Sequence, residues 1–381
     1  MEEKHIIIIC GEPSGDLHAG NLVKEIKNLA PQIKISGVGG RFLEKAGAEI
    51  YQDIKELTVL GFFDVIKKLP KFLSLRRFIL KKIEEGIDAI ILVDYSGFNL
   101  RLAKKINKKI PVIYYISPQL WASRSGRIKT IKRYISKMLV FFKFEKEFYR
   151  KFAIEVDFIG HPLIDIVKPT MKKEDFLKQY NLSDSKITFA LLPGSRIQEI
   201  RIILPLMLKT CLILTERLKD IQFIIAKSEQ ISLEVYQTII KDFVSKLDLR
   251  IIEAKTYDCL NVADFCLVAS GTTTLETAIM QKPFVIIYKM SLLNYLLYRP
   301  QIRVPFIGMV NIIAGRKIIP EFIQFQARPK KIAEEVISIL KDPSLMISEL
   351  ARVKSLLGSP KAAQRAARII LDFLKEKPKD L

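Results

Sequence analysis

The sequence predicts an α/β protein built from two doubly wound parallel sheets. Three observations point to this class. Continuous Ile, Leu and Val runs, such as HIIIIC at residues 5–10, are typical of strands buried on both faces. Segments with helical spacing alternate with these runs, and the same order occurs twice along the chain. At 381 residues, 49% of them hydrophobic, the chain is long enough for two cores and too long for one ordinary core.

The first predicted domain, residues 1–166, has strands at 5–10, 34–40, 88–94, 111–118 and 137–142 and a helix that begins near His18. A polar stretch containing Pro169 follows, and we assign residues 167–185 to a linker. The second domain, 186–358, has strands at 187–192, 221–226, 249–253, 264–270 and 283–288. Residues 359–381 are predicted to form a C-terminal helix that can pack back on the first domain. Parallel sheets bind ligands at the carboxyl ends of their strands, so we expect a cleft between the domains.

The four cysteines and three histidines lack the spacing of metal ligands. We therefore expect buried free thiols in a reducing compartment, and neither a metal site nor a bound cofactor. The N-terminal apolar run is too short for a signal peptide, and nowhere do 18 apolar residues run together. A protein that is neither secreted nor membrane-spanning is expected.

The net charge of +21 is concentrated in one part of the chain. Residues 57–151 hold 22 Lys and Arg against seven Asp and Glu, which indicates a polyanionic partner, either an anionic membrane or nucleic acid. Within this region, the segment 57–83 has more apolar residues than one core-facing stripe needs, which favours an interfacial membrane helix broken at Pro70. Two amphipathic core helices are the alternative. The predicted membrane contacts are Phe62, Phe63, Ile66, Leu69, Phe72, Leu73, Arg76 and Arg77.

Polar or glycine clusters follow several predicted strands. The first cluster, GEPSGD at residues 11–16, has glycines that permit a close backbone approach, while Glu12, Ser14 and Asp16 supply polar atoms. It is not a dinucleotide fingerprint, because G-x-G-x-x-G is absent. A turn in which Ser14 or Asp16 caps the next helix is the alternative.

Asp94 ends the apolar strand DAIILVD. A carboxylate at the tip of such a strand costs stability unless it is hydrogen-bonded, so we expect Asp94 to face a cleft or a fixed donor such as Asn99. Its natural role is that of a general base toward an acceptor hydroxyl.

In the second domain, Ser270, Gly271 and Thr272 connect a buried strand to a helix. Such a turn aims unpaired N–H groups and the helix dipole at one point, which suits an anion, and Glu276 would lie about one turn further on. An ordinary capped turn is the alternative. Arg196, in LLPGSR, offers a forked donor suited to phosphate, with a plain surface turn as the alternative.

About ten motifs occur in one order along nearly the whole chain: GEPSGD, the GVGG of residues 37–40, LGFFDVI, VDYSGFN, YYISPQLWA, IGHPLID, LLPGSR, SGTTTLE, VNIIAGR and PE-x-x-Q at 320–324. By these motifs the sequence resembles the lipid-A-disaccharide synthases.

The resemblance implies a GT-B glycosyltransferase, whose two Rossmann-like domains face a cleft. Its inverting reaction would join UDP-2,3-diacylglucosamine to 2,3-diacylglucosamine 1-phosphate, giving lipid A disaccharide 1-phosphate and UDP. By this likeness Asp94 is the catalytic carboxylate, and Arg196, Glu276 and Asn311 serve the UDP-sugar site. Many members have an acidic residue where this chain has Gly97, which leaves the role of that second acid open.

Together with the strand-end clusters, the resemblance gives two predicted sets of site residues. The catalytic set is Asp94, Glu12 and Asp16. The substrate-binding and UDP-binding set is Ser14, Gly15, Asn99, Arg196, Ser270, Gly271, Thr272, Glu276, Asn311 and Gln324.

The expected location is the cytoplasm, peripheral on the inner face of the inner membrane. We expect no nucleic-acid partner, and the sequence is compatible with a homodimer. Two other readings of the chain are a UDP-sugar 2-epimerase of the same fold and a basic nucleic-acid-binding protein. The apolar segment 57–83 argues against a soluble epimerase. Its Leu, Ile and Phe side chains argue against nucleic acid, since bases stack on exposed Tyr, Trp or His.

Overall fold

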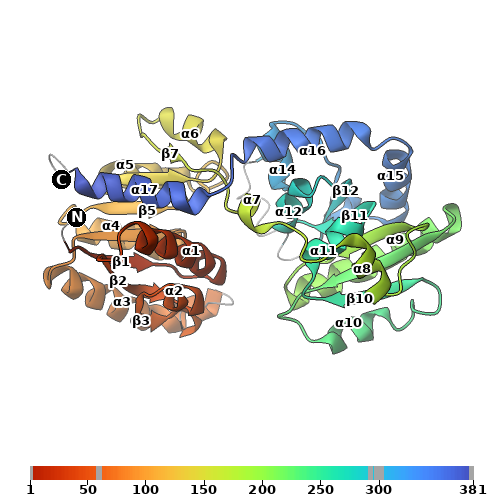
Figure 1. Ribbon diagram of the computed structural model, residues 1–381, viewed down its shortest axis with the longest axis horizontal. Helices are drawn as coiled ribbons and strands as arrows, with labels where there is room; N and C mark the ends of the chain where they lie inside the picture. Colours follow the sequence, from red (N-terminus) through yellow and green to blue (C-terminus); the bar gives the residue numbers. More distant parts are fainter. Residues whose placement is uncertain (1–2, 57–61, 291–294, 296–303, 377–381) are drawn as a thin grey trace. The chain divides into compact units, whose positions relative to one another are not determined.

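The chain divides into two compact units, which the computed structural model describes except at residues 1–2, 57–61, 291–294, 296–303 and 377–381, and except for the side chains of 62–68. One unit comprises Met1–Pro162 with Leu357–Leu381, and the other comprises Leu163–Leu356. Each is an open parallel sheet with helices on both faces, which confirms the predicted fold class (Figure 1).

The first sheet has seven strands in the order β3-β2-β1-β4-β5-β6-β7, and every neighbouring pair is parallel. Its central strands are almost entirely inaccessible to solvent, as their Ile and Val runs predict. The strands are β1 (His5–Ile9), β2 (Lys34–Gly39), β3 (Glu49–Asp53), β4 (Ala89–Val93), β5 (Val112–Tyr115), β6 (Lys137–Val140) and β7 (Asp157–Phe158).

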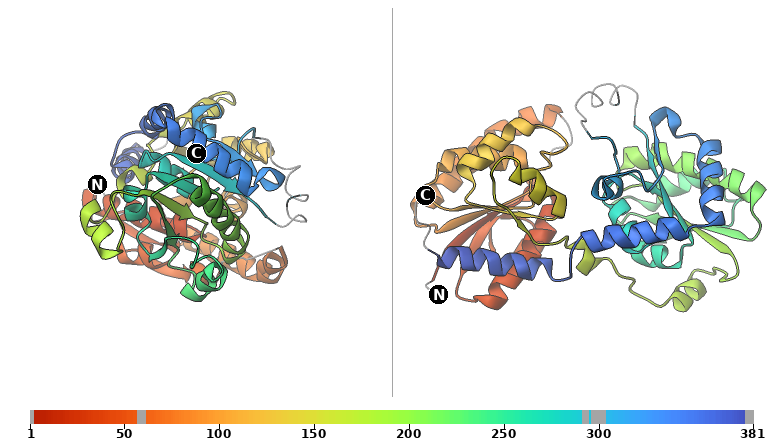
Figure 2. Two further views of the ribbon diagram at one scale, coloured as in Figure 1. Left: turned by 90° about the vertical axis from the view of Figure 1, so that its right-hand side faces the viewer. Right: turned by 90° about the horizontal axis from the view of Figure 1, so that it is seen from above.

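Two layers of helices cover this sheet (Figure 2). One layer consists of α1 (Pro13–Leu29), α2 (Arg41–Lys45) and the C-terminal helix α17 (Ala362–Lys375). The other consists of α3 (Phe62–Glu84), α4 (Ser96–Ile106) and α5 (Ile128–Tyr134), which pack together on the sheet through one apolar cluster. The remaining elements of the unit are the 3-10 turns η1 (Ile54–Glu56) and η2 (Ser125–Arg127) and helix α6 (Lys143–Arg150).

Helix α3 runs through Pro70 without a break, contrary to the expected interruption there. Leu75, Ile79 and Ile83 follow the proline at intervals of four and are buried in the core. Their packing offsets the backbone hydrogen bond that the proline removes. The second half of α3 is therefore an amphipathic helix of the first unit, as the alternative interpretation predicted for this segment.

The second sheet has six strands in the order β10-β9-β8-β11-β12-β13, again all parallel. Its strands are β8 (Ile187–Leu192), β9 (Ile221–Lys227), β10 (Leu249–Glu253), β11 (Phe265–Ala269), β12 (Phe284–Tyr288) and β13 (Glu321–Ile323). Its helices are α7 (Leu163–Ile166), α8 (Lys173–Gln179), α9 (Ile197–Arg217), α10 (Leu233–Ile240), α11 (Thr256–Val262), α12 (Thr273–Ile279), α14 (Met309–Ala314), α15 (Pro329–Lys341) and α16 (Ser344–Leu356), with the 3-10 turn η4 (Gln324–Gln326).

The segment 167–185, which we expected to be a linker, lies within the second unit. The buried Asp258 carboxylate accepts hydrogen bonds from the backbone N–H groups of Thr170 and Met171 and from the Thr170 hydroxyl. Phe176, on α8, is fully buried. The sequence did not predict these two attachments, because each depends on a single residue, Asp258 or Phe176, and the segment itself is rich in charged residues.

The chain passes between the units twice, and the two passages are joined by hydrogen bonds within the first unit. The His161 N–H donates to the Leu357 carbonyl at 2.8 Å. The Arg365 guanidinium, on α17, donates to the carbonyl of Ile159 on the outgoing segment and to that of Ser359 on the returning segment. Helix α17 then packs along α1.

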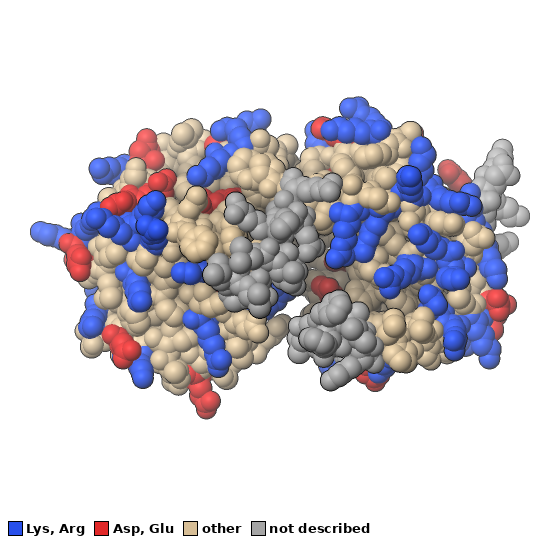
Figure 3. Space-filling view, turned by 180° about the vertical axis from the view of Figure 1, so that it is seen from behind, with Lys and Arg blue, Asp and Glu red and all other residues tan. Residues whose placement is uncertain are grey.

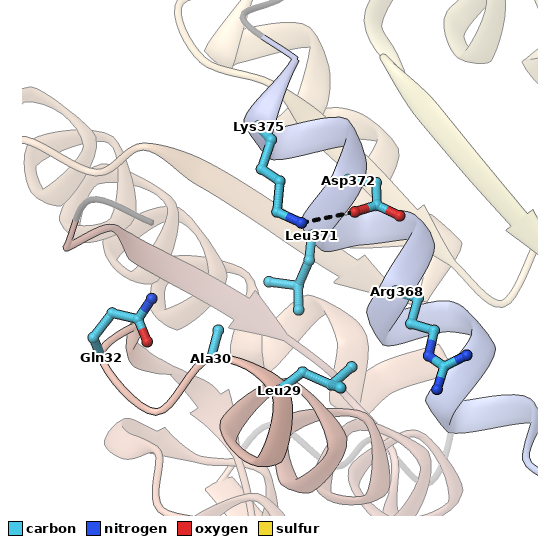
Figure 4. Close-up of a pocket in the computed structure, with 7 residues that line it drawn as sticks. All are labelled: Leu29, Ala30, Gln32, Arg368, Leu371, Asp372 and Lys375. Carbon is cyan, nitrogen blue, oxygen red and sulfur yellow. Dashed lines mark hydrogen bonds and ion pairs between the residues drawn. The ribbon is translucent and has the colours of Figure 1, made fainter.

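A shallow pocket lies between α1 and α17 (Figure 4). Leu29, Ala30 and Gln32 line one side, and Arg368, Leu371, Asp372 and Lys375 line the other. It lies at the end of α1 opposite to the GEPSGD turn, so it is separate from the candidate site described next.

Candidate active site

The predicted strand-end clusters lie where each sheet reverses its strand order. In the first sheet that point is between β1 and β4, which are hydrogen-bonded neighbours. GEPSGD follows β1 and Asp94 follows β4, so both reach the same edge of the sheet. Crevices at such reversal points are the usual ligand sites of open α/β sheets.

Asp94 and Tyr95 form an unusual turn between β4 and α4. Both have left-handed backbone conformations, with φ of 45° and 42°, which are costly for residues other than glycine. The side chains of Asn99 and Tyr114 hold this turn. The Asn99 amide donates to the carbonyls of Val93 at 3.2 Å and Asp94 at 2.9 Å, and the Tyr114 hydroxyl donates to the Asp94 carbonyl at 2.5 Å.

Asn99 therefore has a different place from the one predicted. It is fully buried on α4, and its amide bonds to the end of the preceding strand β4 and to Asp94, so it supports the turn. Tyr114 was not predicted as a site residue. In the sequence it is part of the apolar run of β5, and its hydrogen bond to Asp94 is seen only in the folded structure.

The Asp94 carboxyl group lies in a poorly solvated position. Burial is the main reason that its pKa is raised to about 6, the negative charge of Glu12 raises it further, and a hydrogen bond from the Tyr95 backbone N–H opposes both. Glu12 is exposed and lies at the N-cap of α1. A carboxylate of this kind is ionised at neutral pH and is a stronger base than an ordinary aspartate, which suits a general base.

The Tyr95 ring covers the end of β1. A Cβ at Gly11 would lie 2.4 Å from carbons of this ring, so only glycine leaves room for it. Phe72 from α3 and Phe98 from α4 lie 6.4 and 6.1 Å from the Tyr95 ring centre. Phe72, Tyr95 and Phe98 therefore form an aromatic cluster next to Asp94 in the chain, which links the Asp94 turn to the amphipathic helix α3.

Three further residues of GEPSGD lie in the first turn of α1, which begins at Pro13 and not near His18. Ser14 is exposed and Gly15 is buried against Cys10. Asp16 is 2% exposed and accepts backbone N–H bonds from Gly40, Phe42 and Leu43. Because three donors occupy its oxygens, Asp16 anchors the start of α2 and is not available as a catalytic acid or base.

The described part of the predicted membrane segment is partly exposed. Leu69 is 45% exposed, Arg77 is exposed, and Leu73 and Arg76 are half-buried. Phe72 is half-buried because it belongs to the aromatic cluster. The predicted contacts Phe62, Phe63 and Ile66 lie outside the described side chains. Among the helices of the described residues, we find none that is long and apolar enough to cross a membrane.

In the second sheet, the strand order reverses between β8 and β11. These two strands are hydrogen-bonded neighbours, with Phe189 of β8 opposite Phe265 of β11 and Leu192 opposite Val268. LLPGSR follows β8 and SGTTTLE follows β11, so the two predicted phosphate-binding turns lie side by side. Gly271 and Thr272 are exposed, and a Cβ at Gly271 would meet nothing within 4 Å. The turn before α12 thus has open space in front of it.

Arg196 is exposed and lies at the N-cap of α9, just before its first residue. Its side chain is 83% exposed and is paired with Glu199, with 3.2 Å between guanidinium nitrogen and carboxylate oxygen. Glu199 packs against Gly194, whose φ of +107° only glycine adopts readily. Such an exposed guanidinium can turn toward an anion at the neighbouring β11 turn at little cost, because its ion pair is in contact with water.

Glu276 lies in the first turn of α12 and accepts a hydrogen bond from the Tyr257 hydroxyl at 3.1 Å. Burial raises the pKa of its carboxyl group, and the bonds from Tyr257 and Thr273 oppose this rise. Tyr257, on the neighbouring helix α11, holds the carboxylate in place. Glu276 therefore lies in the first turn of the helix that follows Ser270, Gly271 and Thr272, as expected.

Asn311 and Gln324, two predicted UDP contacts, bond instead to the protein backbone. Asn311 is fully buried, donates to the Ile319 carbonyl and to Glu321, and accepts from two backbone N–H groups. Gln324 exchanges two hydrogen bonds with the backbone of Met290. These side chains stabilise the polypeptide around β13, because their polar atoms have no water to bond to at this depth.

Several known proteins are similar to this chain. A family model described as lipid-A-disaccharide synthetase matches residues 6–369. A lipid-A-disaccharide synthase of Syntrophus aciditrophicus is 40% identical over 99% of each chain, and one of Geobacter sulfurreducens is 39% identical over 97% of each chain. One from Coxiella burnetii is 36% identical over 98% of this chain and all of its own.

Two solved structures share the fold at low identity. A putative UDP-N-acetylglucosamine 2-epimerase from Listeria monocytogenes has a TM-score of 0.65 at 12% identity, over 99% of this chain and 98% of its own. The calicheamicin glycosyltransferase CalG4 has a TM-score of 0.62 at 16% identity, over 99% of this chain and all of its own. These likenesses show the GT-B fold, with its two Rossmann-like domains.

Proposed function

The chain belongs to the lipid-A-disaccharide synthase family and is a glycosyltransferase of lipid A biosynthesis, and from this we propose its substrates and the work of its site residues. The donor is UDP-2,3-diacylglucosamine and the acceptor is 2,3-diacylglucosamine 1-phosphate. Transfer to the acceptor's 6-hydroxyl forms lipid A disaccharide 1-phosphate and UDP. The observation that best supports this proposal is Asp94, a poorly solvated carboxylate at the reversal point of the first sheet, bordered by an aromatic cluster.

In this mechanism Asp94 is the general base. It removes the proton of the acceptor hydroxyl as that oxygen attacks the anomeric carbon of the donor, and the bond to the UDP oxygen breaks with its electron pair leaving on the diphosphate. Attack from the face opposite UDP inverts the anomeric centre. Asn99 and Tyr114 act only through the backbone, by holding Asp94 in its left-handed turn.

The diphosphate is assigned to the turns after β8 and β11. The backbone N–H groups of Gly271 and Thr272 and the exposed guanidinium of Arg196 would stabilise the negative charge that develops as UDP departs, whereas the Ser270 N–H already donates to the Ile287 carbonyl. Glu276 lies one turn into α12, and we assign it to the hydroxyl groups of the ribose.

Replacing Glu276 with Gln is expected to weaken UDP binding about tenfold, because the neutral amide still accepts a hydrogen bond but one that is roughly 1–1.5 kcal/mol weaker than a bond to the carboxylate. The protein should not become less stable. Burial raises the pKa of this carboxyl group, so its ionised form opposes folding at neutral pH. Titration calorimetry with UDP measures the affinity.

Tyr257→Phe is the matched control, because it removes the hydroxyl that orients Glu276 and leaves the carboxylate itself. A smaller loss of UDP affinity is expected for this variant. Unchanged affinity in Glu276→Gln would contradict the assignment to the ribose.

Both proposed substrates are lipids, which suggests a role for the exposed side chains of α3. We propose that the protein binds peripherally to the inner face of the inner membrane through the exposed side chains of α3, so that acyl chains can reach the aromatic cluster beside Asp94. Sedimentation with anionic vesicles measures this binding, and no binding at low salt would contradict it.

The reaction itself is tested with purified protein and the two diacylglucosamine substrates in neutral detergent. UDP and a disaccharide phosphate are expected in equal amounts. If the protein instead converts UDP-N-acetylglucosamine to its 2-epimer and releases no UDP from the lipid substrates, the proposed substrates are wrong.

A further inference from the structure

Three arginines lie close together beside the Asp94 turn. Arg101 is on α4. Arg124 lies just before the turn η2, and Arg127 is the last residue of that turn, which leads into α5. Their charges are near enough to interact: after burial, the charge of Arg124 is the next cause that lowers the pKa of the Arg127 guanidinium, and Arg101 also lowers it. We call Arg101, Arg124 and Arg127 the arginine cluster.

One arginine of the cluster is bonded to the segment that carries the proposed base. The Arg127 guanidinium donates a hydrogen bond of 2.8 Å to the hydroxyl of Ser96, two residues after Asp94. Helix α4 contacts α3 on one side and α5 on the other. The turn of Asp94 and Tyr95, just before α4, therefore has Phe72 of α3 against Tyr95 and Arg127, at the start of α5, against Ser96.

In the part of the chain that the structure describes, the charge of the three arginines has no carboxylate partner, although Lys109 and Lys137 of the same stretch pair with Glu84 and Asp157. From Tyr95 to Phe144 the sequence contains 12 Lys and Arg and no Asp or Glu. Among the residues that the structure describes, no carboxylate forms an ion pair with Arg101, Arg124 or Arg127. Lys and Arg gather on the face of the first unit that bears α3, α4 and α5 (Figure 3). Three guanidinium groups without a counter-ion repel one another, so an anionic ligand would stabilise them.

We propose that the arginine cluster binds the phosphate group of the acceptor, 2,3-diacylglucosamine 1-phosphate. This inference rests on the function proposed above, and it adds a phosphate-monoester subsite to the acceptor side of the reaction. The anion fixes the sugar so that its 6-hydroxyl faces Asp94. The acyl chains, on C2 and C3 of the same ring, then extend toward the aromatic cluster and α3.

The chemistry of the two flanks matches the two kinds of group on one acceptor. Guanidinium groups bind phosphate through paired hydrogen bonds in a fixed geometry, which positions a small ligand better than a lysine does. Phe72 and Phe98 offer an apolar surface at the opposite flank. A general membrane-binding patch needs only exposed charge, whereas Arg127 is half-buried and bonded to the catalytic turn.

The test compares the acceptor with 2,3-diacylglucosamine that lacks the phosphate, each in micelles of a neutral detergent. For the double variant Arg101→Gln/Arg124→Gln, the KM of the phosphorylated acceptor is expected to rise about 10- to 100-fold, because each charged hydrogen bond contributes strongly. The KM of the UDP donor should stay the same. With the acceptor lacking phosphate, this variant and the unmodified protein should have equal kcat/KM.

Lys105→Gln is the matched control, since it removes one exposed positive charge from the last turn of the same helix. It should leave the acceptor KM unchanged. An equal loss with both acceptors in the double variant would overturn the proposal. So would an unchanged acceptor KM combined with lost binding to phosphatidylglycerol vesicles, which would assign the cluster to the membrane surface. If the unmodified protein releases UDP with neither acceptor, the proposed function has failed.

Discussion

Replacing Asp94 with Asn is expected to lower kcat by about 10²- to 10⁴-fold, the usual contribution of a positioned general base. Asn is the best replacement because it has the same shape and tolerates the left-handed backbone that residue 94 adopts, with φ of 45°. The bonds from Asn99 and Tyr114 go to the backbone carbonyl of residue 94, so the turn should stay intact. UDP affinity should therefore be unchanged.

The same substitution should make the protein more stable. Asp94 has its pKa raised from 3.8 to about 6 in the folded state, so protonation favours folding and ionisation opposes it. The penalty is absent below about pH 4, grows as the pH rises toward 6 and is complete above that. It corresponds to at most about 3 kcal/mol. Asp94→Asn should thus melt at a higher temperature than the unmodified protein at pH 8, and at nearly the same temperature at pH 4.

The pH dependence of the reaction is an independent test of Asp94 as the general base. In the unmodified protein, kcat/KM should fall as the pH drops below about 6, because the carboxylate becomes protonated. Glu12→Gln removes the neighbouring charge that raises this pKa, so the fall should move to lower pH. Full activity in Asp94→Asn, or an unshifted profile in Glu12→Gln, would contradict the assignment of Asp94 as base.

The positions of the site turns could be predicted from the sequence because parallel strands place their ends at one edge. Buried Ile and Val runs located the central strands but not the edge strands β3, β7 and β13. The residues that follow the central strands, including Asp94 and Gly271, are at the reversal points of the two sheets. This part of the prediction depends only on periodicity and chain direction.

The roles of individual polar residues could not be predicted in this way. Asp16, Asn99 and Asn311 have the composition of ligand-binding residues, yet all three are buried and bonded to nearby backbone. A buried polar side chain must find partners within the protein, and sequence spacing does not reveal whether those partners are backbone groups or a ligand. The arginine cluster was missed for a related reason, since Arg101 and Arg127 are far apart along the chain.

Gly11→Ala is expected to reduce activity by about 10²-fold, the effect of displacing a catalytic group by roughly 1 Å. The new Cβ would lie 2.4 Å from the Tyr95 ring, so either the ring or the Asp94–Tyr95 turn must move. The ring cannot move without losing its contacts with Phe72 and Phe98. A loss of about 1–3 kcal/mol in stability should accompany the change.

Gly97→Ala is the control, because a Cβ at that nearby position would meet nothing within 4 Å. It should leave activity unchanged and raise the melting temperature slightly, because alanine replaces glycine inside α4.

The double variant Gly11→Ala/Tyr95→Gly separates the collision from other effects of alanine at residue 11. Glycine at residue 95 removes the ring and accepts the left-handed φ of 42° without strain. If the ring is the reason that residue 11 must be glycine, the added alanine should cost almost nothing in the Tyr95→Gly background, in melting temperature and in kcat/KM alike. Additive losses would mean that Gly11 acts on Asp94 by a route that does not involve Tyr95.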